Sequence, residues 1–306
     1  MKIGILSFSW HGKKVAKEEV RLVRVAKKMG HKARVIRVYD CQLLYDGKNP
    51  KVLYQGKKFP KFDIIIPRPM ILMNVDLHVS IIKQFQLMKI PVVNGYMPVM
   101  RAKNKLRTMQ ILNHEGIAVP TTIVLKDDKY LEDAVKRVGG PPVVIKTPFG
   151  SYGAGVVLAE TTMSIKSAWS FIKNNTAAGM VLLQEYIKDA NGCDLRVFVI
   201  GGKVVAAMER QAQEGEFRSN IELGGKGRGL VKIDHQVKKM AIKATKVLGL
   251  QVAGVDIIIS KKGPMVIEVN SNPGFKALEN ATGIDVAEKI IQHAVNYAKR
   301  YKARNG

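Results

Sequence analysis

The chain has 306 residues, which is long enough for two or three subdomains with a large buried core. Hydrophobic residues make up 46% and charged residues 25%, as in an ordinary globular protein. No apolar run approaches 18 residues, which excludes a transmembrane helix and predicts no membrane partner. The first six residues are too short and too polar at their flanks for a secretory signal. Cys41 and Cys193 form no disulfide framework or ligand cluster, so we expect a reducing compartment, the cytoplasm.

The formal net charge is +25, from 50 Lys and Arg against 25 Asp and Glu. The excess is concentrated in residues 1–60, which hold 15 basic and four acidic residues. A field of this sign attracts anions such as nucleotides, nucleic acids, acidic peptides or an acidic membrane. Net charge alone does not choose among them, and it also raises solubility.

The first third of the sequence alternates strand and helix patterns, which is typical of a small parallel α/β domain. Arg68 follows a predicted strand and stands between two prolines, where such folds bind ligands, although a solvated loop arginine fits the pattern as well. We expect strands at residues 2–7, 33–38, 63–66 and 90–94, and helices at residues 14–29 and 79–88.

A helix predicted over residues 100–115 carries a basic side formed by Lys103, Lys105 and Arg107. Further on, a strand ends at Lys146 and is followed by a glycine-rich turn and a returning strand. Glycines let backbone N–H groups approach phosphate oxygens, and the lysine adds positive charge. The turn matches neither a Walker A loop nor a dinucleotide-binding turn, so we interpret it as a β-hairpin that covers phosphates, with an ordinary flexible hairpin as the alternative.

The next strand, residues 180–187, can offer backbone groups to an adenine, with Tyr186 or Ile187 packed on the ring. Two strands at residues 194–200 and 203–210 follow, and alternation places Asp194 and Arg196 on one face. The polar, glycine-rich segment 214–229 is expected to close over a substrate. A helix over residues 236–248 carries an ordinary apolar packing stripe.

A hairpin near the C-terminus carries oxygen ligands. Glu268 and Asn270 are two residues apart on one predicted strand, so both side chains point to the same face. A turn at residues 261–264 pairs this strand with the one that contains Asp256. Two carboxylates and an amide oxygen suit Mg²⁺, although a surface hairpin with scattered polar residues would look the same. A last amphipathic helix spans residues 284–301.

The order of these motifs along the chain resembles that of the ATP-grasp superfamily, and more narrowly that of the RimK-type α-L-glutamate ligases. The resemblance covers nearly the whole chain. It implies a mixed α/β and α+β chain: an ATP-grasp fold with an N-terminal small parallel α/β domain, the pre-ATP-grasp domain. It divides the chain into residues 1–99, residues 100–185 with the glycine-rich hairpin, and residues 186–306 with the magnesium site. The motifs are Lys105, Lys146 with its hairpin, Gln184–Lys188, Asp194–Arg196, Arg218–Asn220, Asp256 and Glu268–Gly274.

The resemblance also implies a reaction, in which ATP activates a carboxylate as an acyl phosphate and an amine then attacks to give an amide. The phosphate and nucleotide contacts would come from Lys105, Lys146, Gly150, Ser151, Tyr152, Gly153, Glu185, Tyr186, Asp194, Arg218, Ser219 and Asn220. Arg196, Arg210 and Arg218 would stabilise the reacting groups. Asp256, Glu268 and Asn270 would hold two Mg²⁺ ions, with Mn²⁺ as a substitute.

The family relationship suggests that the amino acid donor is glutamate, that the acceptor is an acidic peptide or the C-terminus of a ribosomal protein, and that the protein is a homo-tetramer. The sequence departs from the family pattern at Asn104, where an aspartate is common, and at residues 222–225, where a His-Arg-Gly-Gly-like run is replaced by Glu-Leu-Gly-Gly. These departures leave open a ligase that acts on a small metabolite or coenzyme. A basic RNA-binding or ribosome-binding protein that keeps the fold without catalysis is the alternative from another class.

Overall fold

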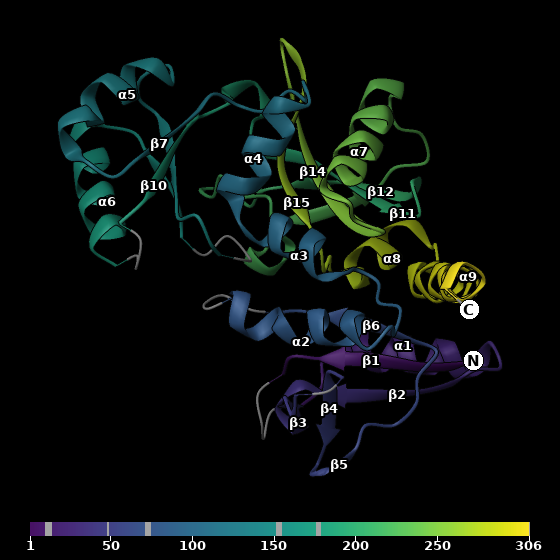
Figure 1. Ribbon diagram of the computed structural model, residues 1–306. Helices are drawn as coiled ribbons and strands as arrows, with labels where there is room; N and C mark the ends of the chain where they lie inside the picture. Colours follow the sequence, from purple (N-terminus) through teal and green to yellow (C-terminus); the bar gives the residue numbers. More distant parts are fainter. Residues whose placement is uncertain (10–13, 48, 71–74, 151–154, 176–178, 306) are drawn as a thin grey trace.

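The computed structural model describes residues 1–9, 14–47, 49–70, 75–150, 155–175 and 179–305 (Figure 1). Four sheets organise this part of the chain. Within it, no helix combines the length and the apolar character needed to cross a membrane.

The N-terminal sheet is parallel, with strand order β2-β1-β6. Alternate residues of β1 point to opposite faces, so Ile3 and Ile5 pack in one core and Leu6 in another. Helix α1 covers the first face through Leu22, and helix α2 covers the second through Phe85. These elements are β1 (Lys2–Ser7), β2 (Lys32–Arg37), β6 (Ile64–Arg68), α1 (Lys17–Lys28) and α2 (Val75–Leu87).

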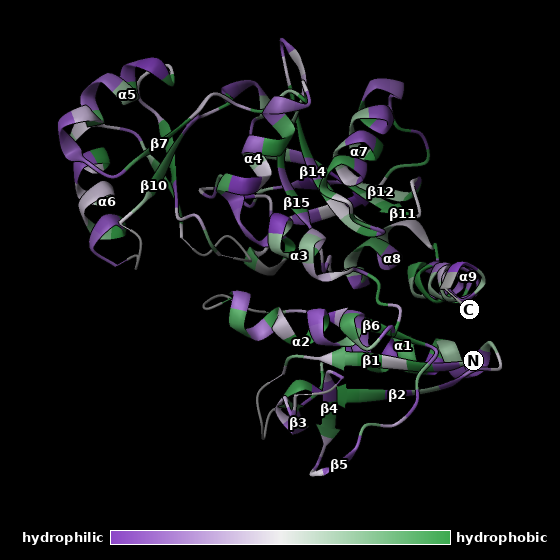
Figure 2. Ribbon diagram, viewed as in Figure 1, coloured by the Kyte–Doolittle hydropathy of each residue, from purple (hydrophilic) through white to green (hydrophobic). Residues whose placement is uncertain are grey.

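The central sheet is antiparallel, with strand order β7-β10-β8-β9, and the helices α5 and α6 cover it. Trp169 of α6 is buried against this sheet. Figure 2 shows hydrophobic colouring along β10 and hydrophilic outer faces on α5 and α6, as expected for helices that shield one side of a sheet. The elements are β7 (Thr122–Leu125), β8 (Val143–Lys146), β9 (Val156–Ala159), β10 (Val181–Glu185), α5 (Leu131–Arg137) and α6 (Thr162–Asn174).

The third large sheet is antiparallel, with strand order β13-β12-β11-β14-β15. Helix α7 packs on one face of it, and the last helix, α9, packs between the other face and the N-terminal sheet. Helix α9 therefore ties the end of the chain to its beginning. The elements are β11 (Cys193–Ile200), β12 (Lys203–Gln211), β13 (Lys226–Gly229), β14 (Val252–Ser260), β15 (Gly263–Asn270), α7 (His235–Leu248), α8 (Lys276–Thr282) and α9 (Val286–Asn305).

The structure differs from the sequence-based prediction in several connections. The single helix expected at residues 100–115 is two helices, because Asn104 leaves the helical conformation and caps the second one by accepting a hydrogen bond from the Arg107 N–H. The strand expected at residues 90–94 is only one bridge, between Val92 and Ile65. The last four residues of the segment expected to close over a substrate, residues 226–229, form the edge strand β13. The helices are α3 (Tyr96–Lys103) and α4 (Lys105–His114).

A small antiparallel sheet and several short helices were not predicted. The sheet consists of β3 (Cys41–Leu44), β4 (Lys51–Tyr54) and β5 (Lys57–Lys58). The 3₁₀ helices are η1 (Val38–Asp40), η2 (Asp128–Tyr130), η3 (Lys188–Ala190) and η4 (Ile221–Leu223).

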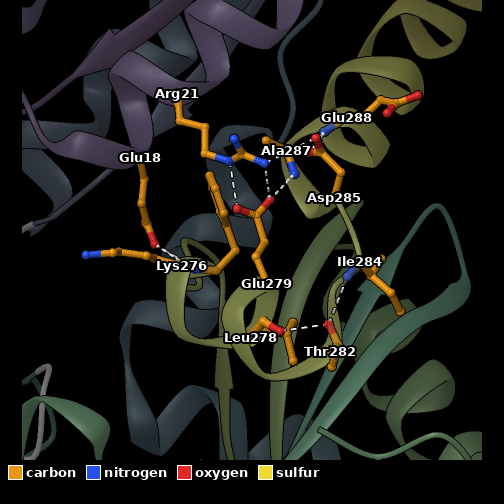
Figure 3. Close-up of polar contacts among 11 residues, drawn as sticks. Glu18, Arg21, Lys276, Leu278, Glu279, Thr282, Ile284, Asp285, Ala287 and Glu288 are labelled. Carbon is orange, nitrogen blue, oxygen red and sulfur yellow. Dashed lines mark hydrogen bonds and ion pairs between the residues drawn. The ribbon is translucent and has the colours of Figure 1, made fainter.

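Helix α1 of the N-terminal part binds α8 and the segment after it through half-buried charges (Figure 3). The Arg21 Nε lies 2.6 Å from an Oε of Glu279, and its Nη2 lies 3.1 Å from an Oδ of Asp285. The Glu18 Oε1 accepts hydrogen bonds from the backbone N–H groups of Phe275, at 2.7 Å, and Lys276, at 2.9 Å. Glu18 thereby satisfies two backbone donors at the first turn of α8.

Arg68 continues this contact toward the end of β15. It is 5% exposed, and its Nη2 donates to the Glu18 Oε2 at 3.0 Å and to the Pro273 carbonyl at 3.1 Å. The guanidinium also lies 5.4 Å from the centre of the Phe275 ring. Arg68 is therefore a buried link between the N-terminal sheet and the loop after β15, and the interpretation as a solvated loop arginine was wrong.

We expect Glu18→Gln to lower the free energy of unfolding by about 1.5–3 kcal/mol, because an amide cannot serve the guanidinium and both N–H groups as a carboxylate does. Urea denaturation followed by circular dichroism measures this change. The control is Glu132→Gln, whose side chain is 72% exposed in its salt bridge to Lys166, and which should cost less than about 0.5 kcal/mol. Equal losses in the two variants would contradict the role given to Glu18.

Candidate active site

A cavity of about 140 Å³ lies between the central sheet and the five-stranded sheet β13-β12-β11-β14-β15. Most of the residues predicted from the sequence line it. Arg196 and Asn270 line a smaller adjoining pocket instead. Ser151, Tyr152 and Gly153 lie outside the described residues. The predicted residues that line the larger cavity are Lys105, Lys146, Gly150, Glu185, Tyr186, Asp194, Arg210, Arg218, Ser219, Asn220, Asp256 and Glu268.

Two lysines reach the cavity from different elements. Lys146 is the last residue of β8, and its Nζ donates to the Gln184 Oε1 at 2.6 Å. Lys105 is the first residue of α4, where its backbone N–H donates to the Pro148 carbonyl at 2.9 Å and its Nζ to the Gly150 carbonyl at 3.3 Å. Burial, assisted by the nearby Lys105 charge, lowers the pKa of Lys146 to about 8, and burial also lowers the pKa of Lys105. A bound anion would therefore stabilise the ammonium form of both lysines.

Apolar side chains beside β10 form a slot in the same cavity. Glu185 is fixed there, because its backbone N–H donates to the Thr121 carbonyl at 2.8 Å and its Oε2 accepts from the Thr121 N–H at 3.2 Å. The slot suits a flat aromatic base, with backbone groups of β10 at its rim. Sequence reasoning named Tyr186 and Ile187 here but missed the other apolar residues, because only the strand pairing shows that they face one cavity. The residues that were missed are Val144, Val156, Ile258 and Ile267.

A buried cluster of two arginines and two aspartates forms the floor of the site, and we call it the Arg–Asp cluster: Asp194, Arg196, Arg210 and Asp256. Arg196 binds Asp256 through Nε at 2.7 Å and Nη2 at 2.6 Å. Arg210 binds Asp194 through Nε at 2.7 Å, and its Nη2 also lies 3.0 Å from the Asp256 Oδ2. The two positive and two negative charges balance, which is how charged side chains become tolerable in the interior.

The cluster fixes the charge state of Asp256. Burial would raise the pKa of this carboxyl, but the charges and hydrogen bonds of Arg196 and Arg210 outweigh it and hold the pKa below its usual range. Asp256 is therefore an anion at neutral pH. Arg210 is 2% exposed and bound to both aspartates, so the structure gives it a partner that the sequence did not reveal. The predicted catalytic roles of Arg196 and Arg210 stay predictions.

The predicted metal ligands come together as expected from the hairpin. Asp256 pairs with Glu268, and Gly254 pairs with Asn270, on the neighbouring strands β14 and β15. The Asn270 Nδ2 lies 3.4 Å from the Asp256 Oδ2, which leaves the Asn270 Oδ1 as an acceptor. Glu268 has no hydrogen-bond or salt-bridge partner among the described residues.

These oxygens fit a hard cation. Mg²⁺ commonly takes one or two carboxylates and completes its shell with water and substrate phosphates. No group of three His, Cys, Asp or Glu side chains in the described ranges is placed to hold a metal ion by itself. Glu268 and the Asn270 Oδ1 therefore fit Mg²⁺, whereas both carboxylate oxygens of Asp256 are bound by Arg196 and Arg210 in this structure. The ligand roles and the number of ions stay predictions.

The loop before η4 closes one side of the cavity. Arg218 donates from Nε to the Glu216 Oε1 at 3.0 Å and from Nη2 to the Oε2 at 2.7 Å. These hydrogen bonds lower the pKa of Glu216 to about 2. Ser219 and Asn220 follow directly and line the cavity. The predicted segment thus lies where it can reach a nucleotide. Glu216, which the sequence did not single out, fixes the position of the Arg218 guanidinium.

Comparisons with known proteins agree with this architecture. The RimK PreATP-grasp domain family matches residues 1–97, and the RimK-like ATP-grasp domain family matches residues 102–294. A probable alpha-L-glutamate ligase of Vibrio cholerae is 42% identical over 312 residues, with 99% of each chain covered.

Solved structures show the same fold at lower identity. The RimK domain protein ATP-grasp of Sphaerobacter thermophilus has a TM-score of 0.76 at 18% identity, and the match covers 96% of this chain and 100% of the other. The ATP-grasp ligase PsnB, complexed with minimal precursor, Mg and ADP, has a TM-score of 0.71 at 16% identity, with 97% and 98% covered. The expected ATP-grasp fold with a pre-ATP-grasp domain, and with it the expected ATP-dependent ligase forming a carbon–nitrogen bond, are confirmed. The chain belongs to the RimK-like ATP-grasp family.

Proposed function

We propose that the protein adds glutamate to the C-terminal carboxylate of a protein or peptide, through an acyl phosphate formed with ATP and Mg²⁺. The observation that carries the proposal is a single cavity that joins an apolar slot, two lysines with lowered pKa values and an oxygen-rich hairpin. A purely RNA-binding protein has no need for that combination. The name of the Vibrio cholerae relative supports glutamate as the amino acid, and the precursor bound by PsnB supports a peptide as the acceptor.

In this proposal each part of the site has one task. The slot beside Glu185 and Tyr186 takes the adenine, Asp194 takes the ribose, and Lys105, Lys146 and the glycine-rich turn take the phosphates. Asp256, Glu268 and Asn270 would hold Mg²⁺, which when bound would neutralise phosphate charge and orient the transferring group. Arg196, Arg210 and the segment Arg218–Asn220 flank the reacting end.

The reaction then follows from the positions of these groups. A carboxylate oxygen of the acceptor attacks the γ-phosphorus, the bond from that phosphorus to the β–γ bridging oxygen breaks, and ADP leaves. The amine of glutamate next attacks the acyl carbon. The carbon–oxygen bond to phosphate breaks, the amine loses its proton, and an amide and inorganic phosphate result. Lys105, Lys146 and Arg196 stabilise the negative charge that builds up on the transferring and leaving oxygens.

Product mass spectrometry tests the proposal. The reaction would contain ATP, Mg²⁺, glutamate and a peptide that ends in glutamate, and we expect ADP together with the mass increase of one or more glutamate residues. The same peptide with a C-terminal amide is the matched control, because it has no terminal carboxylate to activate. Equal reaction of the amidated peptide, or ADP release only with a small acid, would overturn the proposed acceptor. The proposed homo-tetramer is tested separately by light scattering of the purified protein.

Nucleotide binding should depend on pH through Lys146. Its pKa of about 8 in the free protein means that the ammonium form declines above pH 8, while a bound phosphate favours that form. We therefore expect the Kd of a non-hydrolysable ATP analogue to rise roughly tenfold from pH 7.5 to pH 9. Isothermal titration calorimetry of the analogue in the presence of Mg²⁺ measures the Kd at each pH. Lys146→Arg keeps the charge at all these pH values and should flatten the profile, and a wild-type profile without slope would contradict the assignment.

A further inference from the structure

A second pocket lies beside the nucleotide cavity, and we call it the Lys103 pocket. The two share Lys105, Gly150, Asn220 and Glu268, so the Lys103 pocket opens at the end where the γ-phosphate would lie. Its volume is about 50 Å³. A water molecule needs on the order of 10–15 Å³ by this measure, so the pocket has room for one end group of a substrate and not for a whole amino acid. Its remaining lining comes from α3, β11 and the loop after β15: Ala102, Lys103, Arg196, Asn270, Ser271, Asn272, Pro273 and Gly274, with Pro69 and Met70 after β6.

Of the three cations that line this pocket, Lys103 is the one whose ammonium group forms no hydrogen bond or salt bridge with the described residues. Arg196 is bound to Asp256, and the Lys105 Nζ donates to the Gly150 carbonyl. Lys103 is half-buried at the end of α3 and has no hydrogen-bond or salt-bridge partner within the described parts of the chain. Partial burial of an ammonium that makes no hydrogen bond to the protein costs free energy, and an anionic ligand would reduce that cost.

The charges around Lys103 support an anionic ligand. Asp256 balances the charge of Arg196, which leaves Lys103 and Lys105 against one carboxylate, Glu268, a predicted magnesium ligand. Burial lowers the pKa of Lys103 to about 8, the Glu268 charge opposes this effect, and Lys105 and Arg68 add to it. A bound anion would raise the pKa of Lys103 again and increase the fraction of the lysine that is protonated.

We propose that the Lys103 pocket binds one carboxylate group of a substrate, with the Lys103 ammonium as its ion-pair partner. The proposal rests on the ligase function proposed above and adds Lys103 as a residue that binds the substrate. A carboxylate matches the size of the pocket, and Asn220 and Asn270 offer amide groups at its edge.

Two carboxylates of the reaction have this chemistry: the one that is activated on the acceptor and one carried by the incoming glutamate. Steady-state kinetics of Lys103→Met separate them, because only the substrate whose carboxylate binds Lys103 should show a higher KM. We expect an increase of roughly 10- to 100-fold for that substrate, as for the loss of one charged hydrogen bond. The Kd of a non-hydrolysable ATP analogue should change less than threefold. Lys103→Arg should recover most of the affinity, and Lys136→Met, at an exposed position of α5, is the control for loss of a surface charge.

A second measurement does not depend on turnover. Lys103 can be modified with an amine-reactive reagent at pH 8 and quantified by mass spectrometry. The protecting probe is N-acetylglutamate or an N-acetylated, lysine-free peptide that ends in glutamate, because a free amine would consume the reagent. Protection by one of these probes is expected. If neither probe protects Lys103 and the Lys103→Met variant keeps both KM values, the inference is wrong even when ligation proceeds. If no acid supports ADP release but protection persists, the proposed reaction fails while the carboxylate pocket stands.

Discussion

Replacing Glu268 by glutamine should reduce the rate of ATP-dependent ligation on the order of 10³-fold. Glu268 is the carboxylate that both pockets share, and it lies opposite Asp256 on the paired strands β14 and β15. Its negative charge is what a cation between these strands and the phosphates would bind. An amide of the same shape keeps one oxygen acceptor but loses the charge, so we expect the metal affinity and the rate to fall together.

The fold should tolerate this change. The Glu268 side chain has no hydrogen-bond or salt-bridge partner within the described residues, although its charge attracts Lys103, Lys105 and Lys146. Its replacement breaks no hydrogen bond, and we expect the free energy of unfolding to change by less than about 1 kcal/mol. Mn²⁺ binding, followed by electron paramagnetic resonance with a non-hydrolysable ATP analogue, gives a readout besides activity. The control is Glu288→Gln, at an exposed position of α9. Undiminished turnover and Mn²⁺ binding in Glu268→Gln would remove Glu268 from the metal site.

The hairpin that carries Glu268 could be predicted from the sequence because its signals are local. The period of two puts Glu268 and Asn270 on one face, and the turn at residues 261–264 pairs their strand with the strand of Asp256. The register set by the turn would place Asp256 opposite Ile267, and a β-bulge that the sequence did not reveal shifts the pairing to Glu268. The N-terminal parallel sheet was predictable for the same reason, since its apolar strands alternate with helices. Both predictions needed only neighbouring residues along the chain.

The contacts between distant segments could not be predicted in this way. Glu18 and Arg68 are 50 residues apart, and Arg68 is 205 residues from the carbonyl that it binds. The partners in the Arg–Asp cluster depend on strand register, which pairs Asp194 with Arg210 and Arg196 with Asp256. Alternation gives the face of each side chain but not its neighbour on the next strand.

The break between α3 and α4 is an intermediate case, because its signal was present but ambiguous. Asn104 is a common N-cap residue, yet the apolar positions on both sides fit one continuous helix. The break matters for the site, because it places Lys105 at the start of a helix and Lys103 at the end of another. The two lysines thereby line adjoining pockets, and only Lys105 lines both.

Replacing Arg210 by methionine should cost about 3–5 kcal/mol of folding free energy, the largest stability effect that we expect in the chain. Arg210 is buried, and it is the partner that binds both oxygens of Asp194. Without it Asp194 would be a buried carboxylate with no bound cation, whereas Asp256 would keep Arg196. Arg196→Met should cost less, about 1–2 kcal/mol, because Arg210 remains beside Asp256 and the Arg196 side chain is 11% exposed.

The pH dependence of unfolding tests this explanation. Burial already raises the pKa of Asp194 in the presence of Arg210, and the loss of the arginine should raise it further. A carboxyl whose pKa is higher in the folded state than in the unfolded state loses stabilisation as the pH rises. The deficit of Arg210→Met should therefore be smaller at pH 5 than at pH 7.5 in urea denaturation. The double variant Arg210→Met/Asp194→Asn removes the charge and should recover part of the loss at pH 7.5. A deficit that is independent of pH and unaffected by Asp194→Asn would show that Arg210 stabilises the core by packing alone.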